Sequence, residues 1–285
     1  MRKWLNLDSE EWAGILRSGF GASLIDVAEG AETSRVTIFR AGPFRIAYPE
    51  FPVGATQYPR SLTNAIVRAA RDHRVDMLRF HSCGSVQAES HVTALDLGTH
   101  VIPDVQAWDV SGIEKARRSR NRANRSPLAI ERAVAHDAPE MYALYLQTLS
   151  RRGGSKRYTL PYFRALAGAN SSLIARLDGR VCGFVSFAYQ GLRACYLHGA
   201  HDASTRRYYA SDLLFYEMIS MAKAHGAKVF DFLPSPPDQP SLAHYKSAWG
   251  AVAGPFVVSD IDVRPLRAGF FRAAKRMAAL LANAR

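Results

Sequence analysis

The sequence predicts an α+β protein with two similar domains, each a mostly antiparallel sheet with flanking helices. The main support is residues 173–251, where three apolar runs, a helical pattern, a fourth apolar run and a short helix follow one another. That order predicts an antiparallel sheet ending in a β-α-β crossover. Residues 23–98 repeat strand, strand, helix and strand more faintly, which suggests an internal duplication. The 285 residues suffice for two domains, and we expect a cleft between them.

In the first half, apolar periodicity separates the expected elements. A period of 3.6 residues predicts helices, and alternation of apolar and polar residues predicts strands. Residues 45–59 hold three prolines, which predicts a loop. The expected helices are residues 10–20 and 61–74, and the expected strands are residues 23–30, 35–42, 75–82 and 93–98.

A basic segment separates the two halves. Residues 115–125 contain six basic residues and no acid, and on a helix Lys115, Arg118, Arg122 and Arg125 share one face. Such like charges repel one another unless an anion lies nearby, although a solvated linker helix is an alternative. The whole chain has 37 Lys and Arg against 25 Asp and Glu, a formal net charge of +12. This charge favours a polyanionic partner such as tRNA or other nucleic acid, a phosphorylated cofactor or anionic lipid, with solubility alone as the alternative.

The second half is more regular. Pro127 ends the basic helix, and Asp137-Ala-Pro139 opens a helix whose end is marked by Gly153-Gly154. The last segment, residues 264–285, is a basic amphipathic helix that docks on the body or lies on a membrane surface. The remaining expected strands are residues 128–134, 173–179, 181–189, 194–201, 229–236 and 256–263, and the remaining helices are residues 161–169, 211–227 and 241–251.

Several function classes lack their sequence signatures. The sequence has no GxSxG, no GxxxxGK[ST] and no GxGxxG after a strand. The three cysteines have no metal-ligand spacing. His198 and His201 lie three apart on an expected strand and would point to opposite faces, so no metal is expected. No run reaches the length of a membrane span, and the N-terminus lacks the apolar core of a secretory signal. We therefore expect a reduced cytoplasmic protein without stable membrane insertion.

Five short segments carry a resemblance to a known family. They are KARRSRNRANR (residues 115–125), TLSRRGG (residues 148–154), ARLDGRVCGF (residues 175–184), HGAKVFDF (residues 225–232) and LAHYKSAWGA (residues 242–251). In these segments the sequence resembles the Fem-type aminoacyltransferases. These enzymes consist of two tandem GNAT-like domains and build peptidoglycan cross-bridges. The long coiled-coil arm of some members is absent. The resemblance therefore leaves the acceptor open: a small molecule, a peptide or a peptidoglycan precursor.

The resemblance implies roles for individual residues. Lys246 with Tyr245 matches the family's aromatic-Lys pair, which serves the acyl-donor end of aminoacyl-tRNA, and Trp249 belongs to the aromatic-Gly-Ala that follows. There an ammonium can neutralise a tRNA phosphate or the developing oxyanion. Arg151 matches the Arg at the helix end that holds a phosphate of the acceptor, and Arg152 is an adjacent alternative.

The prediction of the acyl donor depends on the sequence of one turn. Acyl-CoA-dependent GNAT proteins bind pyrophosphate in a glycine-containing turn at a helix N-terminus. Here residues 206–211 read RRYYAS and contain no glycine, which argues against CoA. The expected donor is aminoacyl-tRNA with no cofactor, and acyl-CoA is the alternative. The residues expected at the donor are Arg206, Arg207, Tyr209, Lys115, Arg118, Arg122 and Arg125.

These inferences define the expected domains of an N-acyltransferase that we expect to be a monomer. Residues 1–107 form a degenerate GNAT-like domain on the acceptor side, and residues 108–130 form the basic linker helix. Residues 131–262 form the GNAT-like donor domain, and residues 263–285 form the C-terminal helix. The expected reaction joins an aminoacyl group to an acceptor amine through an amide bond.

Overall fold

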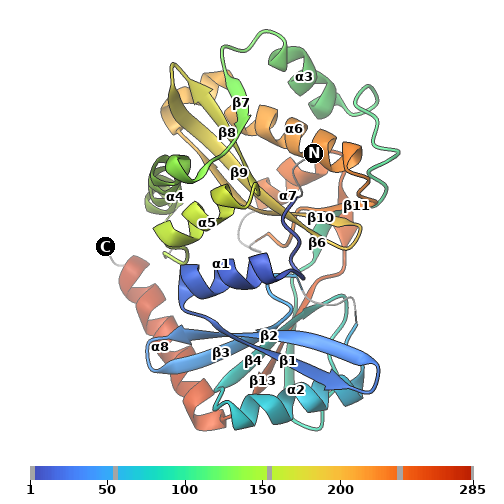
Figure 1. Cartoon of the computed structure of the whole chain (residues 1–285), viewed down its shortest axis with the longest axis vertical. Helices are drawn as coiled ribbons and strands as arrows, with labels where there is room; N and C mark the ends of the chain where they lie inside the picture. The colour runs from blue at the N-terminus through green and yellow to red at the C-terminus, as the bar shows by residue number, and fades with distance from the viewer. Residues whose placement is uncertain (1–3, 54–56, 153–155, 236–239, 284–285) are drawn as a thin grey trace. The chain divides into compact units, whose positions relative to one another are not determined.

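The computed structural model describes residues 4–53, 57–152, 156–235 and 240–283, without the side chains of residues 278–283. Gly153 and Gly154, the expected end of a helix, lie outside these residues. The chain forms two compact units (Figure 1). The larger unit comprises Met1–Gly19 and Thr99–Gly254, and the smaller unit comprises Phe20–Gly98 and Pro255–Arg285.

The larger unit is built on a seven-stranded sheet of order β12-β6-β11-β10-β9-β8-β7. Strands β8 (Ser172–Leu177), β9 (Arg180–Gln190) and β10 (Arg193–His201) are antiparallel neighbours, and helix α6 (Ala210–Ala224) leads to β11 (Val229–Asp231), parallel to β10. The predicted crossover is therefore confirmed. The hairpin between β8 and β9 turns at Asp178 and Gly179, both with positive φ (49° and 80°), as a tight two-residue hairpin requires.

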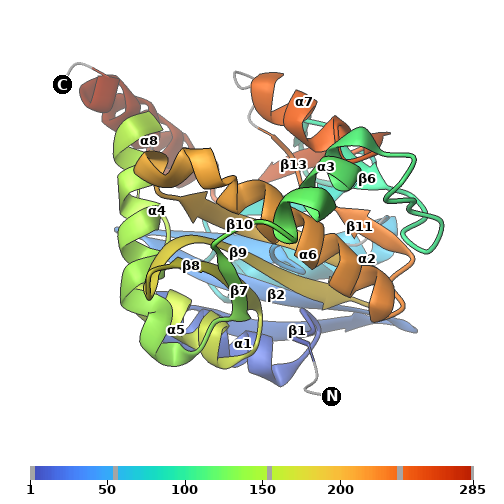
Figure 2. The same ribbon diagram turned by 90° about the horizontal axis from the view of Figure 1, so that it is seen from above.

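Helices cover both faces of this sheet (Figure 2). Consecutive residues of a strand point to opposite faces. On β9 a Cβ atom at Gly183 would lie 3.2 Å from the Ala210 side chain of α6, whereas the next residue, Phe184, packs 5.5 Å from the ring of Phe163 on α5. The main core lies between α6 and the sheet. The other elements of this unit are α1 (Glu10–Phe20, ending one residue beyond it), α3 (Glu114–Ala123), β7 (Ala129–Arg132), α4 (Ala138–Arg152), α5 (Leu160–Gly168), the 3-10 turns Ala135–Asp137 and Ala203–Tyr208, α7 (Pro240–Ser247) and β12 (Val252–Gly254).

The smaller unit has a six-stranded sheet of order β1-β2-β3-β4-β13-β5. Strand β3 (Phe44–Pro49) pairs along β2, so the expected loop at residues 45–59 is wrong for its first five residues. Prolines occur at strand ends, and Pro49 is the last residue of this strand. The other elements are β1 (Ser23–Glu29), β2 (Glu32–Ala41), α2 (Arg60–Asp72), β4 (Met77–Ser82), β5 (Val92–Asp96), β13 (Val257–Asp262) and α8 (Pro265–Asn283).

The two sheets share one topology. Each has three antiparallel strands, a helix, and a fourth strand parallel to the third: β1-β2-β3-α2-β4 in one unit and β8-β9-β10-α6-β11 in the other. Beyond the fourth strand each sheet takes one strand from the other half of the chain. Strand β6 (Thr99–Ile102) pairs with β11, and β13 pairs with β4. The compact units therefore depart from the expected domain boundaries, because β6 and β13 each pair outside the domain in which the sequence placed them.

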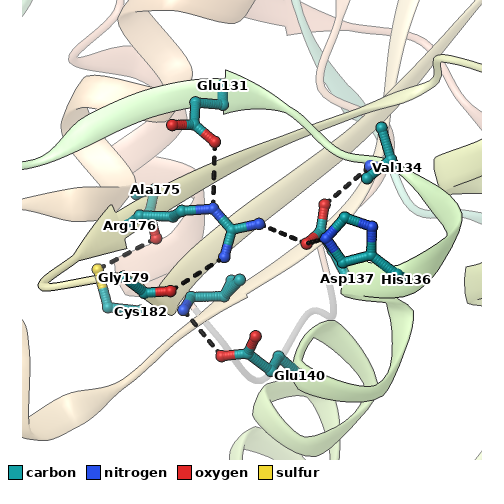
Figure 3. A network of polar contacts seen from close by, with 10 residues as sticks. Glu131, Val134, His136, Asp137, Glu140, Ala175, Arg176, Gly179 and Cys182 are labelled. Carbon is teal, nitrogen blue, oxygen red and sulfur yellow. Dashed lines mark hydrogen bonds and ion pairs between the residues drawn. The ribbon is translucent and has the colours of Figure 1, made fainter.

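A polar network ties β8 to the start of α4 in the larger unit (Figure 3). Arg176 on β8 donates hydrogen bonds to Asp137, to Glu131 (3.1 Å) and to the carbonyl of Gly179 (3.2 Å). Asp137 is 1% exposed and also accepts a bond from the backbone N–H of Val134 (2.8 Å). Because both charges are paired, the network can be buried without leaving a bare carboxylate.

Candidate active site at the start of helix α6

The candidate site lies where β10 and β11 stop pairing. Their parallel register covers only Arg193–Cys195 and Val229–Asp231, whereas β10 continues to His201. The pairing of β10 with β9 is also irregular between Tyr196 and His198. Beyond these points β10 and β11 diverge, and the chain leaving β10 enters α6 through the turn at residues 203–208. Strand ends and a helix N-terminus thus converge in one region, a common location for ligand sites in such sheets.

Lys246 on α7 is buried in this region. Its side chain donates a hydrogen bond to the carbonyl oxygen of Leu233, just beyond β11, and the residue is 2% exposed. Burial lowers the pKa of Lys246 to about 8, although the nearby Asp231 carboxylate acts in the opposite direction. Lys246 was expected to neutralise either a tRNA phosphate or a developing oxyanion, and both roles stay predictions. A buried ammonium can act only on charge that enters the site.

Two backbone features hold Lys246 in place. Leu233 has a φ of 57°, a left-handed conformation that leucine rarely adopts, and its N–H bonds to Oδ1 of Asp231 (2.8 Å). Gly250, after α7, has a φ of 83°, and a Cβ atom there would lie 2.7 Å from the Ile113 side chain. Only glycine fits this position without strain, which explains the glycine of the aromatic-Gly-Ala motif.

Asp212, in the first turn of α6, joins three residues predicted for the site. Its carboxylate accepts a hydrogen bond from the Tyr245 hydroxyl (3.0 Å) and pairs with Lys115 Nζ (2.7 Å) and Arg122 (3.2 Å). Burial and this carboxylate raise the pKa of the Tyr245 phenol. Lys115 and Arg122 therefore share one carboxylate of the protein itself, and their expected contact with RNA stays a prediction. The guanidinium of Arg122 also lies 3.7 Å from the ring centre of Tyr209.

A second group surrounds His201 at the end of β10. Its Nδ1 lies 2.9 Å from Oγ of Ser211, and its backbone carbonyl accepts a bond from Arg151 (3.2 Å). Burial, followed by the positive charges of Arg151, Arg152 and Arg206, lowers the pKa of His201. The structure thus brings together two arginines predicted for the acceptor and one predicted for the donor. The positive charge of these arginines near His201 is suited to attracting a phosphate or carboxylate.

The remaining predicted residues are less closely connected to this region. Arg207 donates a bond to the hydroxyl of Tyr208 (2.8 Å), Arg118 pairs with Glu114 on the same helix, and Arg125 is exposed. Trp249 is fully buried and packs 6.0 Å from the ring of Phe215. It is a core residue, which corrects the expectation that it contacts substrate.

Sequence reasoning missed Asp212, Ser211, His201 and Leu233 as parts of the site. A signal existed for Asp212, because an acid in the first turn of a helix is favoured by the helix dipole and can also attract cations. The partners Lys115 and Arg122 lie about ninety residues earlier in the chain, so no local pattern links them to it. The conformation of Leu233 has no sequence signature at all.

Neither a metal centre nor a membrane-spanning helix occurs within the described residues. No group of three or more His, Cys, Asp and Glu side chains among them is arranged to hold a metal ion. None of the helices in that part of the chain combines the length and apolar character needed to cross a membrane.

Comparisons with known proteins agree with this fold. Residues 111–247 match the Acetyltransferase (GNAT) domain family, and no curated protein matches the chain. Among solved structures, FemX has a TM-score of 0.64 at 14% identity, with 93% of this chain and 95% of FemX covered. The C-terminal domain of a putative lysylphosphatidylglycerol synthetase from Agrobacterium fabrum has a TM-score of 0.58 at 16% identity (89% and 87% covered). A tandem GNAT protein from the clavulanic acid biosynthesis pathway has a TM-score of 0.55 at 15% identity (89% and 87% covered).

At these identities the structural similarities establish the fold, and the family match covers the segment that holds α3, α6 and Lys246. Residues 111–247 therefore match an acetyltransferase (GNAT) domain, and the chain as a whole has a tandem GNAT-like fold similar to that of FemX.

Proposed function

We propose that this acyltransferase moves an aminoacyl group from aminoacyl-tRNA to an amine of an acceptor substrate, forming an amide. The acceptor is a small molecule, a peptide or a peptidoglycan precursor. The protein needs no metal and no covalent intermediate for this reaction, because the aminoacyl ester is already activated. Its task is to orient the two substrates and to stabilise the charge that develops on the carbonyl oxygen.

The observation that carries the choice of donor is Asp212 in the first turn of α6. In CoA-dependent relatives a helix N-terminus at this place binds pyrophosphate, which requires free N–H groups and a positive field. Here the positive field of the α6 N-terminus acts on the carboxylate of Asp212, which also pairs with Lys115 and Arg122. The turn before it contains no glycine, and Tyr209 takes a left-handed conformation (φ 59°) there. These features disfavour a pyrophosphate and favour a donor without one.

In the proposed reaction the acceptor nitrogen attacks the ester carbonyl of aminoacyl-tRNA. A C–N bond forms, the C–O bond to the terminal ribose breaks, and the ribose oxygen leaves with a proton lost by the amine. The Lys246 ammonium stabilises the intermediate oxyanion. The hydrogen bond from Tyr245 to Asp212 fixes the ring of Tyr245 next to Lys246 at the donor end of the site. Arg151, Arg152 and Arg206 supply positive charge for substrate phosphate or carboxylate groups.

An acyl-CoA donor is the second candidate. It is favoured by the match of residues 111–247 to the Acetyltransferase (GNAT) domain family and by the arginines at the entry of α6. The acceptor would again be an amine or amino sugar. The two donors predict different binding partners, so one set of measurements separates them.

The test combines product detection with donor binding. The protein is incubated with a pool of aminoacylated tRNA and a panel of amine-bearing acceptors, and amide products are identified by mass spectrometry. Parallel reactions contain acetyl-CoA, whose binding is also measured by titration calorimetry. An amide formed only with charged tRNA, and lost in Lys246→Met, is expected. Product formation from acetyl-CoA with micromolar binding would instead support the second candidate.

Lys223→Met is the matched control for that experiment. Lys223 also donates a hydrogen bond to a backbone carbonyl, that of Trp108 (2.8 Å), but from the far end of α6. Both variants lose one lysine and one hydrogen bond. Equal loss of activity in the two variants would contradict a specific role for Lys246.

A further inference from the structure

Helix α8 is fixed to the smaller unit by one face. Ala268 is fully buried there, and Phe271 packs 5.6 Å from the ring of Phe44. Arg267 donates to Asp76 (2.7 Å), and Arg272 donates to Asp262 (2.6 Å). Asp76 is 1% exposed, so its pair is a strong anchor. These contacts determine which face of the helix points outward.

The outward face is apolar. Leu266, Phe270 and Met277 are 82%, 68% and 63% exposed, the three highest values among the exposed large apolar residues of the described chain. Their spacing of four and seven residues places them on one stripe, with the exposed Ala273 and Ala274 between them. The stripe extends over about 16 Å of the helix at 1.5 Å per residue. Amphipathic helices normally bury such a stripe, so its exposure indicates a surface that is covered in use.

The positive charge of α8 indicates what kind of partner covers this apolar stripe. Residues 263–285 contain six basic residues and no acid, and the chain has a net charge of +12. Arg264, Arg267 and Arg272 pair with Asp76 or Asp262, whereas Arg276 is exposed and has no ion pair among the described residues. A second copy would bring the same cationic helix against itself, which is unfavourable. An anionic lipid surface accepts both features, because acyl chains take the apolar side chains and headgroups attract the basic ones.

We propose that α8 docks the protein on anionic membrane surfaces through the stripe Leu266, Phe270 and Met277. The docking is peripheral: the inner face of the helix stays on the protein, and only the outward side chains enter the interface. Arg276, exposed beside the stripe, contributes electrostatic attraction. This proposal is independent of which acyl donor the enzyme uses.

Flotation with vesicles tests the proposal on the full chain. We expect binding to vesicles of phosphatidylcholine mixed with phosphatidylglycerol and little binding to phosphatidylcholine alone. Phe270→Gln with Met277→Gln should weaken binding to the mixed vesicles by at least about tenfold, since each side chain loses its apolar transfer. Arg276→Gln should weaken it about fivefold and only where anionic lipid is present.

Leu95→Gln is the matched control, because Leu95 is 58% exposed in the same unit but lies on β5. It should bind vesicles like the unaltered chain. Thermal unfolding checks that the variants stay folded, as expected for exposed positions. Absence of binding to the mixed vesicles would overturn the proposal, and so would equal binding by the double variant. A dimer in light scattering that becomes a monomer in the double variant would overturn it in favour of a second copy.

Discussion

The Nζ atom of Lys115 lies 2.7 Å from Oδ2 of Asp212, and this pair fastens the basic helix α3 to the first turn of α6. The Asp212 side chain is only 8% exposed, so the pair is shielded from solvent on one side. A helix rich in like charges gains here the anion that it needs for stability. The anion belongs to the protein itself, and it also holds Tyr245 beside the candidate site.

Asp212→Asn should destabilise the protein and impair the reaction. The variant keeps the size of the side chain but leaves Lys115 and Arg122 without their counter-charge, at a cost of about 3 kcal/mol in the free energy of unfolding. Tyr245→Phe removes only one hydrogen bond and should cost about 1 kcal/mol. Urea denaturation measures both. A loss in Asp212→Asn no larger than in Tyr245→Phe would show that the ion pairs contribute little.

The fold of the second half could be predicted because its signals are local. Strands β8, β9 and β10 are continuous apolar runs, and Asp178-Gly179 marks the hairpin between the first two. Strand β13 was expected but in the wrong sheet, and β6 was not expected at all, because each pairs with a sheet formed by the other half of the chain. Sequence patterns specify that a strand forms, whereas its partner is decided by the packing of distant segments.

The residues of the candidate site could likewise be predicted only where a local motif marked them. Motifs pointed to Lys246, Tyr245 and the arginines, but spacing could not reveal that Lys246 is buried. The three arginines near His201 come from two separate segments, and only the fold brings them together. For the same reason the partner of Lys115 was missed. Burial and long-range pairing decide whether a cation faces solvent or a carboxylate.

Asp137→Ala should be the most destabilising substitution in the network around Arg176 (Figure 3). It removes a buried carboxylate that pairs with Arg176 and caps the N–H of Val134, so we expect a loss of about 3 to 5 kcal/mol in the free energy of unfolding. Asp26→Ala is the control, because Asp26 is 71% exposed in its pair with Arg35 and should cost less than about 1 kcal/mol. Urea denaturation compares them. Similar losses would mean that the buried pair adds nothing beyond a surface pair.

RNA binding should depend on the exposed cations in and just after α3, such as Arg118 and Arg125, rather than on Lys115 and Arg122, which pair with the buried Asp212. Arg118→Gln with Arg125→Gln should lower tRNA affinity and reduce the slope of its salt dependence by roughly 0.7 to 0.9 for each phosphate that the variant no longer neutralises. Arg40→Gln, an exposed arginine on β2, should leave the slope unchanged. Filter binding at several salt concentrations measures the slope. An unchanged slope in the double variant would remove this helix from the RNA surface.

Activity should fall as the pH rises through about 8, because burial lowers the pKa of Lys246 to about 8 and the proposed reaction needs its ammonium. The same deprotonation has the opposite effect on stability. The pKa of this lysine is lower in the folded protein than its ordinary value of 10.5, so the folded state releases the proton first and its stability rises between about pH 8 and 10.5. A decline in kcat/KM together with a rising melting temperature therefore identifies loss of the ammonium rather than unfolding. Lys246→Met should lack both trends. An activity that increases through pH 8 would instead assign Lys246 the role of a neutral base.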